Sequence, residues 1–277
     1  MKIKEEIIKS KSNPTVKWLA SLQDKKGRKE SKSFIIEGEK LTFEAIENKL
    51  PITHIVLLES KNKFILPKIN TLLSKNGIED VEIVFVSEDV FSKISSEKAP
   101  QGVITVIKYL DFFQNLDIIY KEEFFLKDDE RAVVLCSLRD PGNLGSVIRS
   151  AVAFGVEHII LTNDCADIYN TKTVRSAMGS LFKVRISEVG SLCEFLVTAQ
   201  NSGRRVFAAE LTDTAVSLSD VDIKKQDIFI IGNEGHGIPK EVSSLCDASV
   251  YIPISKNTES LNASVAAGIL MWEQSKK

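Results

Sequence analysis

The chain lacks long apolar runs and has few residues of the kinds that build metal or disulfide sites. None of its apolar stretches approaches the ~18 residues that suggest a membrane span. The first six residues carry no apolar signal core, and their acids argue against a transit peptide. The few cysteines are too scattered for paired metal-ligand spacing: Cys136, Cys165, Cys193 and Cys246. We therefore expect a cytoplasmic protein with reduced thiols, no metal site and no membrane anchor.

The composition is that of a globular protein, and its charge is distributed unevenly. Hydrophobic residues make up 43% of the 277 residues and charged residues 27%, enough for one or two domains with sizeable cores. The net charge is −2, but residues 1–36 carry ten lysines and arginines against four acids, a local charge of +6. Residues 109–130 carry a local charge of −5. The basic end is either a surface for nucleic-acid backbone or a solvated, partly mobile tail.

Alternating strand-like and helical patterns predict two α/β domains. In residues 1–108, strands are expected at 34–36, 54–58, 82–86 and 103–107, with helices at 14–23, 39–49, 63–75 and 88–95. The acidic segment 109–130 interrupts this pattern, so we expect it to be a linker.

The alternation resumes over residues 131–277, the second predicted domain. Strands are expected at 132–137, 158–162, 205–209, 228–232 and 250–254, with helices near 144–154, 172–181, 191–202, 239–245 and 261–274. Continuous apolar runs such as 228–231 suit strands buried on both faces, which indicates a mostly parallel sheet. The last helix is expected to place Leu261, Val265 and Trp272 on one face.

Three polar loops stand out in the second domain, each following a strand-like run. The first is Asp140-Pro141-Gly142-Asn143, followed by Arg149 in the helical stretch. The second is Gly232-Asn233-Glu234-Gly235-His236-Gly237, and the third runs from Ile252-Pro253 to Ser260-Leu261-Asn262. Such loops let backbone approach a ligand while side chains point at it.

Each loop also has a simpler explanation. Asn143, Ser260 and Asn262 are good helix caps. Arg149 and Arg175 are then solvated or ion-paired helix residues, and Glu234 is a favourable charge before a helix. The glycine spacing of the second loop matches neither a dinucleotide fingerprint nor a phosphate loop, which argues against an oxidoreductase. The three histidines lack a nucleophile elbow, which argues against a serine hydrolase.

Taken together, the three loops resemble the motifs of the SpoU (TrmH-like) branch of the SPOUT RNA 2′-O-methyltransferases. Residues 130–277 are similar to the catalytic domain of that family, a deep-knotted α/β fold in which the C-terminal segment threads through a loop. Residues 12–107, with Arg28-Lys29, Phe34 to Gly38 and Pro100-Gln101-Gly102, are similar to the ribosomal-protein-like substrate domain that often precedes it.

The resemblance implies roles for individual residues. Arg149 would activate the ribose hydroxyl, with Asn143, Glu234, Ser260 and Asn262 positioning it. S-adenosylmethionine (SAM) would contact four residues: Leu211, Gly232, Ile252 and Leu261. Because a guanidinium is essentially never deprotonated, Arg149 is expected to stabilise the developing alkoxide while water or phosphate takes the proton.

The sequence therefore predicts a homodimeric, SAM-dependent methyltransferase of RNA, with large-subunit ribosomal RNA as substrate. Arg28, Lys29, Lys32 and Arg175 are expected to bind that RNA. The dimer is expected to form through the last helix, at Ala263, Ala266, Ala267 and Trp272. A tRNA methyltransferase of the same branch and a non-catalytic RNA-binding assembly factor are the alternatives.

Overall fold

The structure, a computed structural model, describes residues 2–110, 113–115 and 126–277, without the side chains of residues 3–5 and 113–115. It contains two compact units. Unit 1 comprises Met1–Leu110 and Asp167–Phe182, and unit 2 comprises Asp111–Ala166 and Lys183–Lys277. Residues 167–182, which we expected in the catalytic domain, pack with the N-terminal residues instead. Much of the acidic linker predicted over 109–130 lies outside the described residues.

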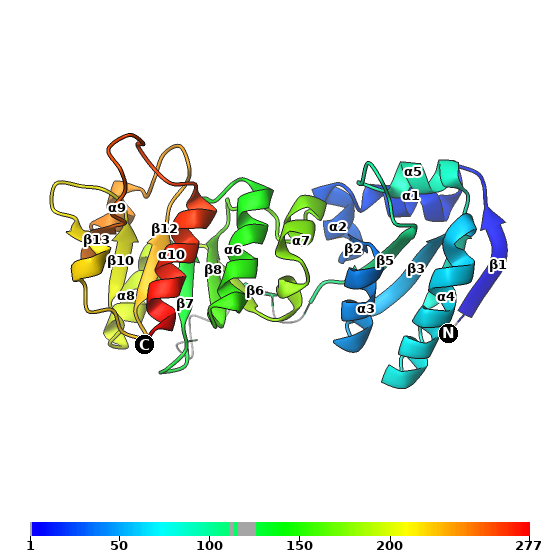
Figure 1. Ribbon diagram of the computed structural model, residues 1–277, viewed down its shortest axis with the longest axis horizontal. Coiled ribbons are helices and arrows are strands. Elements are labelled where there is room, and N and C mark those ends of the chain that lie inside the picture. The colour runs from blue at the N-terminus through cyan, green and yellow to red at the C-terminus, as the bar shows by residue number, and fades with distance from the viewer. Residues whose placement is uncertain (1, 111–112, 116–125) are drawn as a thin grey trace. The chain divides into compact units, whose positions relative to one another are not determined.

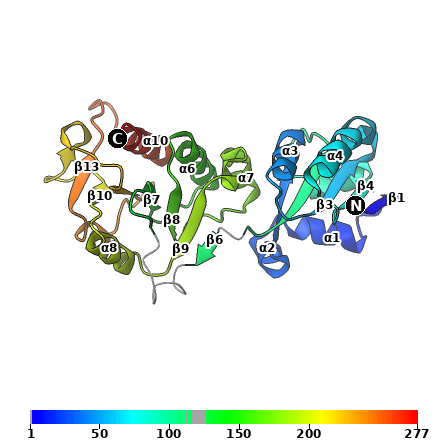
Figure 2. The ribbon, with the colours of Figure 1, turned by 90° about the horizontal axis from the view of Figure 1, so that it is seen from below.

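Unit 1 is a five-stranded mixed sheet covered by helices on both faces. Its elements are β1 (Lys2–Ile8), α1 (Pro14–Ser21), α2 (Lys25–Ser31), β2 (Ser33–Glu37), α3 (Glu39–Glu47), β3 (Ile52–Leu58), α4 (Asn62–Asn76), β4 (Glu82–Val86), α5 (Glu88–Ile94), β5 (Val103–Lys108) and α7 (Thr171–Ala177). The strand order is β1-β4-β3-β5-β2, and β5 runs antiparallel to β2 and β3. Figures 1 and 2 show α3 and α4 on one face and α1 on the other.

The strands and helices predicted for this unit are confirmed, but β1 and α2 were not predicted. Both elements are rich in charged residues, so neither shows a hydrophobic pattern that could predict it. β1 pairs only with β4, at the edge of the sheet, where charged residues are tolerated. Because residues 2–8 form a strand and residues 14–31 form two helices, the alternative of a solvated, mobile tail is wrong.

Unit 2 is an eight-stranded sheet in the order β11-β13-β10-β12-β7-β8-β9-β6. Its elements are β6 (Phe113–Asn115), β7 (Ala132–Leu135), α6 (Pro141–Ala153), β8 (His158–Thr162), β9 (Arg185–Val189), α8 (Leu192–Asn201), β10 (Val206–Ala209), β11 (Val216–Ser217), β12 (Ile228–Ile231), α9 (Lys240–Ser243), β13 (Ala248–Tyr251) and α10 (Ala263–Ser275). Each strand pairing of this sheet is parallel, which confirms the predicted parallel sheet. The threading of the C-terminal segment stays a prediction.

Helices cover both faces of this sheet, as the continuous apolar strands require. α6 and α10 lie on one face and α8 on the other (Figure 2). The β12 residues Ile228 to Ile231 are all buried. β9 was not predicted, because an arginine and a glutamate interrupt its apolar pattern. Its buried Ser187 forms a hydrogen bond of 2.8 Å with His158 on β8.

The apolar face predicted on α10 is not the face that packs inward. Ala263, Ala267 and Leu270 are buried against the unit's own core, whereas Val265 and Trp272 are each 50% exposed. The helix is apolar on nearly all sides, so periodicity alone cannot say which face turns inward. Ala263 and Ala267 are therefore unavailable to a partner surface, contrary to our expectation.

Candidate active site

The three polar loops of unit 2 follow β7, β12 and β13. In a parallel sheet the carboxyl ends of the strands meet at one edge, where ligands bind in α/β proteins. β7 and β12 are neighbours, and β10 separates β12 from β13. The strand order thus brings together loops that are far apart in the sequence.

Asn143 does not cap its helix as predicted. Asp140 is the cap: its carboxylate accepts the Asn143 backbone N–H at 2.8 Å, and Pro141 occupies the first helical position. An aspartate followed by proline is a better start signal than an asparagine three residues after that aspartate. Asn143 therefore lies in the first turn of α6 with its side chain available for other contacts.

The second loop is closed by its own residues. The backbones of Asn233 and Gly237 exchange hydrogen bonds of 3.1 and 3.0 Å, and the Asn233 amide donates to the Ser137 carbonyl in the first loop at 2.8 Å. A Cβ on Gly232 would lie 2.5 Å from the Gly237 carbonyl carbon, so the tight loop itself requires a glycine there. We had not singled out Asn233; an asparagine among glycines, a common turn residue, was the available signal.

Asn143 joins all three loops through its side chain. Its Nδ2 donates to Glu234 Oε1 at 2.8 Å, and its Oδ1 accepts from Asn262 Nδ2 at 3.0 Å. Asn262 is the N-cap of α10: its Oδ1 accepts the Ser264 N–H at 2.9 Å, which leaves its amide hydrogens to face Asn143. The capping interpretation of Asn262 is therefore confirmed, and the same residue also contacts the other loops. This network lies at the surface, where a polymer can reach it.

Arg149 projects from α6 and is exposed. Each of the other seven arginines forms at least one side-chain hydrogen bond, whereas none to Arg149 is found among the described residues. The alternative explanation of Arg149, a surface ion pair, thus has no partner in the described part of the chain. The structure does not join Arg149 or the Ser260 side chain to the Asn143 network.

A cavity of about 460 Å³ lies beside the third loop. Leu211, Ile252 and Leu261, three of the four expected cofactor residues, line it together with Ser260. Gly232 is not among the described residues that line it. The volume lies within the roughly 300–1,000 Å³ typical of small-molecule sites. Leu211 is 76% exposed, an apolar surface that a ligand would cover.

Arg28 is not available to RNA. It is 1% exposed, and its guanidinium donates to Asp167 Oδ2 at 2.7 Å and to the Leu22 and Gln23 carbonyls at 2.9 and 2.7 Å. Our expectation that it binds RNA is wrong, because its charge is used inside unit 1. Lys29 and Lys32 are exposed as expected.

Arg175 lies on α7, in unit 1, where it forms an ion pair with Glu97 and remains half exposed.

None of the helices among the described residues is long and apolar enough to cross a membrane. The described residues contain no group of three or more side chains that could hold a metal ion. All four cysteines are free, and Cys136 and Cys165 are buried. Burial raises the pKa of the Cys136 thiol to about 11.

Comparison with known proteins identifies both parts of the chain. Residues 130–272 match the SpoU rRNA Methylase family, and residues 13–105 match an MRM3-like substrate binding domain. The Bacillus subtilis 23S rRNA (guanosine(2553)-2'-O)-methyltransferase RlmP is 29% identical over 96% of this chain and 97% of its own length. The 23S rRNA (uridine(2479)-2'-O)-methyltransferase of Streptomyces viridochromogenes is 28% identical over 96% of this chain and 90% of its own.

A solved structure is similar over the whole chain. The AdoMet-bound rRNA methyltransferase from Sinorhizobium meliloti superposes with a TM-score of 0.84 at 30% identity, covering 99% of this chain and 98% of that one. Fold, loops and matches define an enzyme, a methyltransferase that uses SAM. The chain belongs to the SpoU rRNA Methylase family.

Proposed function

We propose that the protein transfers a methyl group from SAM to a ribose 2′-hydroxyl of large-subunit ribosomal RNA. This proposal is carried by the hydrogen-bonded network of Asn143, Glu234 and Asn262. Asn262 is two residues from Ser260, which lines the cavity. It supplies fixed amide and carboxylate groups at the surface beside a cavity of cofactor size. The two relatives from Bacillus subtilis and Streptomyces viridochromogenes both act on 23S rRNA ribose hydroxyls.

The cavity residues fit the cofactor. Leu211, Ile252 and Leu261 offer apolar surface, and the backbone of the loops offers amides and carbonyls to an adenine edge and an amino-acid group. SAM supplies a methyl group bound to a positively charged sulfur. No phosphate needs to be held, which agrees with glycines spaced unlike a phosphate loop.

The chain's own residues then orient and stabilise the hydroxyl. Glu234 Oε2 has no partner among the described residues, so it is free to accept a hydrogen bond from the ribose. The hydroxyl oxygen would take the methyl group as the bond between that group and the SAM sulfur breaks, and the hydroxyl proton must leave. The permanently charged Arg149 stabilises the alkoxide that develops. Water or an RNA phosphate takes the proton.

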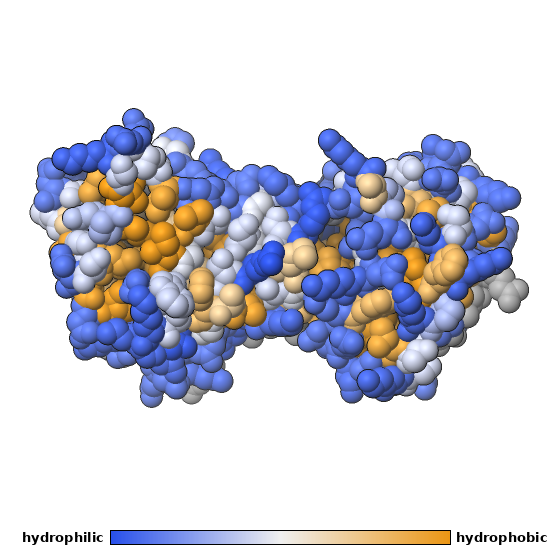
Figure 3. Space-filling model, viewed as in Figure 1, coloured by the Kyte–Doolittle hydropathy of each residue, from blue (hydrophilic) through white to orange (hydrophobic). Residues whose placement is uncertain are grey.

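We further propose that two chains form the active dimer. Arg149 is six residues beyond Asn143, so it leaves α6 roughly 120° around and about 9 Å along the helix. A second chain can bring such a cation to the network. Figure 3 shows apolar side chains gathered on the face of unit 2 that carries α10. Trp272, which was predicted for the partner surface, is 50% exposed, and the equally exposed Val265 takes the place of the predicted Ala263 and Ala267.

The substrate-domain match favours ribosomal RNA over tRNA, because unit 1 adds a recognition surface to the catalytic part. A non-catalytic RNA-binding factor would not require the joined Asn143 network. We place the enzyme in the cytoplasm, because the bacterial relatives act on 23S rRNA, which bacteria hold there.

The proposal is tested by mapping 2′-O-methylation in ribosomal RNA from cells with and without this gene. One ribose of the large-subunit RNA should lose its methyl group in the deletion strain and regain it on complementation. An unchanged map of ribosomal RNA, with a methyl group missing from a tRNA, would contradict the proposed substrate.

The cofactor cavity is tested separately with Leu211→Asp. Because Leu211 is exposed, the substitution should leave stability unchanged while weakening SAM binding by tenfold or more, as measured by calorimetry. Val197→Asp, at an exposed position of α8 outside the cavity, is the matched control. Gly232→Val is a poor test, because it would disrupt the loop itself.

A further inference from the structure

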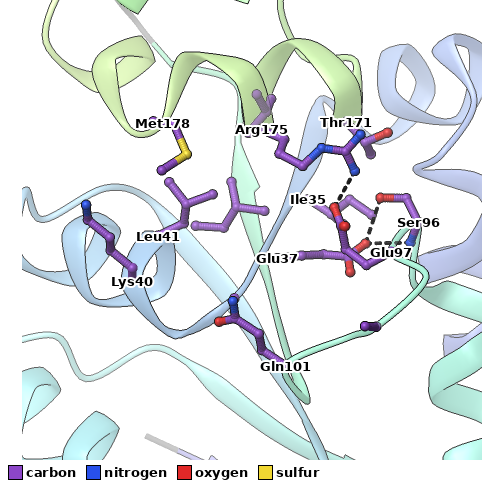
Figure 4. A pocket seen from close by; sticks show the side chains of 14 residues that line it. Ile35, Glu37, Lys40, Leu41, Ser96, Glu97, Gln101, Thr171, Arg175 and Met178 are labelled. Atoms are coloured by element: carbon purple, nitrogen blue, oxygen red, sulfur yellow. Dashed lines mark hydrogen bonds and ion pairs between the residues drawn. The ribbon is translucent and has the colours of Figure 1, made fainter. Parts of the chain in front are cut away.

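Unit 1 contains a second cavity, of about 260 Å³, that the proposed chemistry does not use. Its walls come from the end of β2, the start of α3, the loop at residues 96–101 and α7 (Figure 4). It is smaller than the cofactor cavity. This volume suits a single nucleoside better than a larger ligand.

One wall of this cavity is apolar. Ile35 and Val174 are buried, whereas Met178 is 41% exposed and lies over Leu41 in Figure 4. Met178 also adopts a left-handed backbone conformation, with φ +50°, which a non-glycine residue rarely adopts. An exposed thioether held in that conformation offers a polarizable surface to a flat ring.

The opposite wall carries fixed polar groups. The Glu37 carboxylate accepts from the Ser95 hydroxyl at 2.7 Å and from the Ser96 N–H at 2.6 Å. Gln101 Oε1 accepts the Glu39 N–H at 3.1 Å, so its NH₂ group points elsewhere and has no partner among the described residues. The cavity thus presents both an acceptor and unused donors to a ligand.

Two cations stand at the cavity. Lys40 is exposed, and Arg175 is half exposed in its ion pair with Glu97. A partly exposed ion pair contributes little to stability, so an incoming phosphate can replace Glu97 at small cost. Cations beside an apolar wall with amide donors match the parts of one nucleotide: phosphate, ring face and base edge.

We infer that this cavity binds one unpaired nucleotide of the RNA substrate, with its base against Met178 and its phosphate at Arg175. The inference rests on the proposed function, since it takes the substrate to be RNA. A base in a duplex is stacked on both faces and cannot enter, so the site selects a loop, bulge or strand end. Unit 1 would then recognise RNA by a defined pocket as well as by surface charge.

The test measures binding of a fluorescein-labelled, unstructured ten-nucleotide RNA by anisotropy, alongside the same strand annealed to its complement. Met178→Ser changes no charge and should weaken single-strand binding by about tenfold, a typical effect of losing a stacking contact. Lys40→Gln/Arg175→Gln should weaken it at least as much. Both variants should bind duplex as wild type does.

The matched control is Lys98→Gln/Lys172→Gln, which removes the same charge from the loop at residues 96–101 and from α7, at positions outside the cavity lining. It should retain single-strand binding. Equal losses in control and cavity variants, or wild-type binding by Met178→Ser, would overturn the inference. So would micromolar binding of free AMP that displaces the RNA, because the cavity would then serve a free nucleotide.

Failure of this inference is distinguishable from failure of the proposed function. If the cavity variants methylate large-subunit RNA with unchanged kcat/KM, the nucleotide site is wrong and the methyltransferase assignment stands. If the cavity variants lose single-strand binding but the wild-type protein methylates no ribosomal RNA, the nucleotide site stands and the proposed function is wrong.

Discussion

Asn143 is the residue through which the three loops of unit 2 meet, since it bonds to Glu234 and to Asn262 at once. Asn143 does not cap α6, because Asp140 is the N-cap of that helix. Function and stability can therefore be separated at two positions, three residues apart, at the start of one helix.

Replacing Asn143 by aspartate should place a second carboxylate against Glu234 and repel it. We expect methyl transfer to fall by about 10²-fold or more, on the scale of losing an oriented polar contact in a transition state. The melting temperature should change little. Single-turnover rates and thermal unfolding measure the two effects.

Asp140→Ala is the complementary variant. It should cost about 1 kcal/mol of unfolding free energy through the lost cap. A normal rate in Asn143→Asp would show that the network does not serve catalysis.

At the scale of elements, the buried pair of Arg28 on α2 and Asp167 holds residues 167–182 in unit 1. Arg28→Met should lower the free energy of unfolding by roughly 3 kcal/mol, because the mostly buried Asp167 carboxylate loses its cation and the carbonyls of Leu22 and Gln23 lose their donor. Lys29→Met, one residue along and exposed, is the control and should cost little. Urea unfolding compares them, and equal stabilities would contradict a structural role for Arg28.

A second prediction at this scale concerns the contact between β8 and β9. Burial, aided by Arg185 and Arg204, lowers the pKa of His158 from 6.5 to about 3. Between these values the unfolded chain binds a proton that the folded chain does not, so stability falls as pH falls below 6.5. Each pH unit well below 6.5 should cost about 1.4 kcal/mol from this group.

His158→Gln removes the titration, so the variant should lose less stability than wild type when urea unfolding at pH 7 is compared with pH 5. The same loss in both proteins would mean that other groups cause the effect. The variant's lower stability at pH 7 does not enter, because only the difference between the two pH values is compared.

These elements also show what the sequence can predict. Runs such as 228–231 identify strands because they are buried on both faces. β1 and β9 could not be predicted in this way, because charged residues interrupt their apolar runs. The structure tolerates these residues because β1 lies at the edge of its sheet and Arg185 of β9 forms an ion pair. The loop residues were found from their chemistry, but their pairing was not. Asn143 lies 91 residues from Glu234 and 119 from Asn262, and only the strand order brings them together.

At the scale of the whole molecule, unit 1 is expected to supply RNA affinity. Removing residues 1–108 is a poor test of this, because residues 167–182 belong to unit 1 and would lose their contacts with Arg28 and Phe34. Full-length charge variants are better.

Lys29→Glu/Lys32→Glu should weaken RNA binding and reduce its dependence on salt, by roughly one unit of slope for each lost phosphate contact. Lys49→Glu/Lys75→Glu, exposed elsewhere in unit 1, is the control. SAM binding should be unchanged in both. Equal salt slopes for the two variants would show that the basic end does not contact RNA.

The central claim is that Arg149 stabilises the reacting ribose oxygen, and its most direct measurement is single-turnover transfer of labelled methyl groups to large-subunit RNA. Arg149→Ala should keep its fold and its SAM affinity, measured by calorimetry, while the rate falls by about 10²–10³-fold, as for other lost transition-state donors. Arg149→Lys keeps the charge but loses the planar fork, so its rate should lie between those of the wild type and Arg149→Ala. A near-normal rate in Arg149→Ala would contradict the claim.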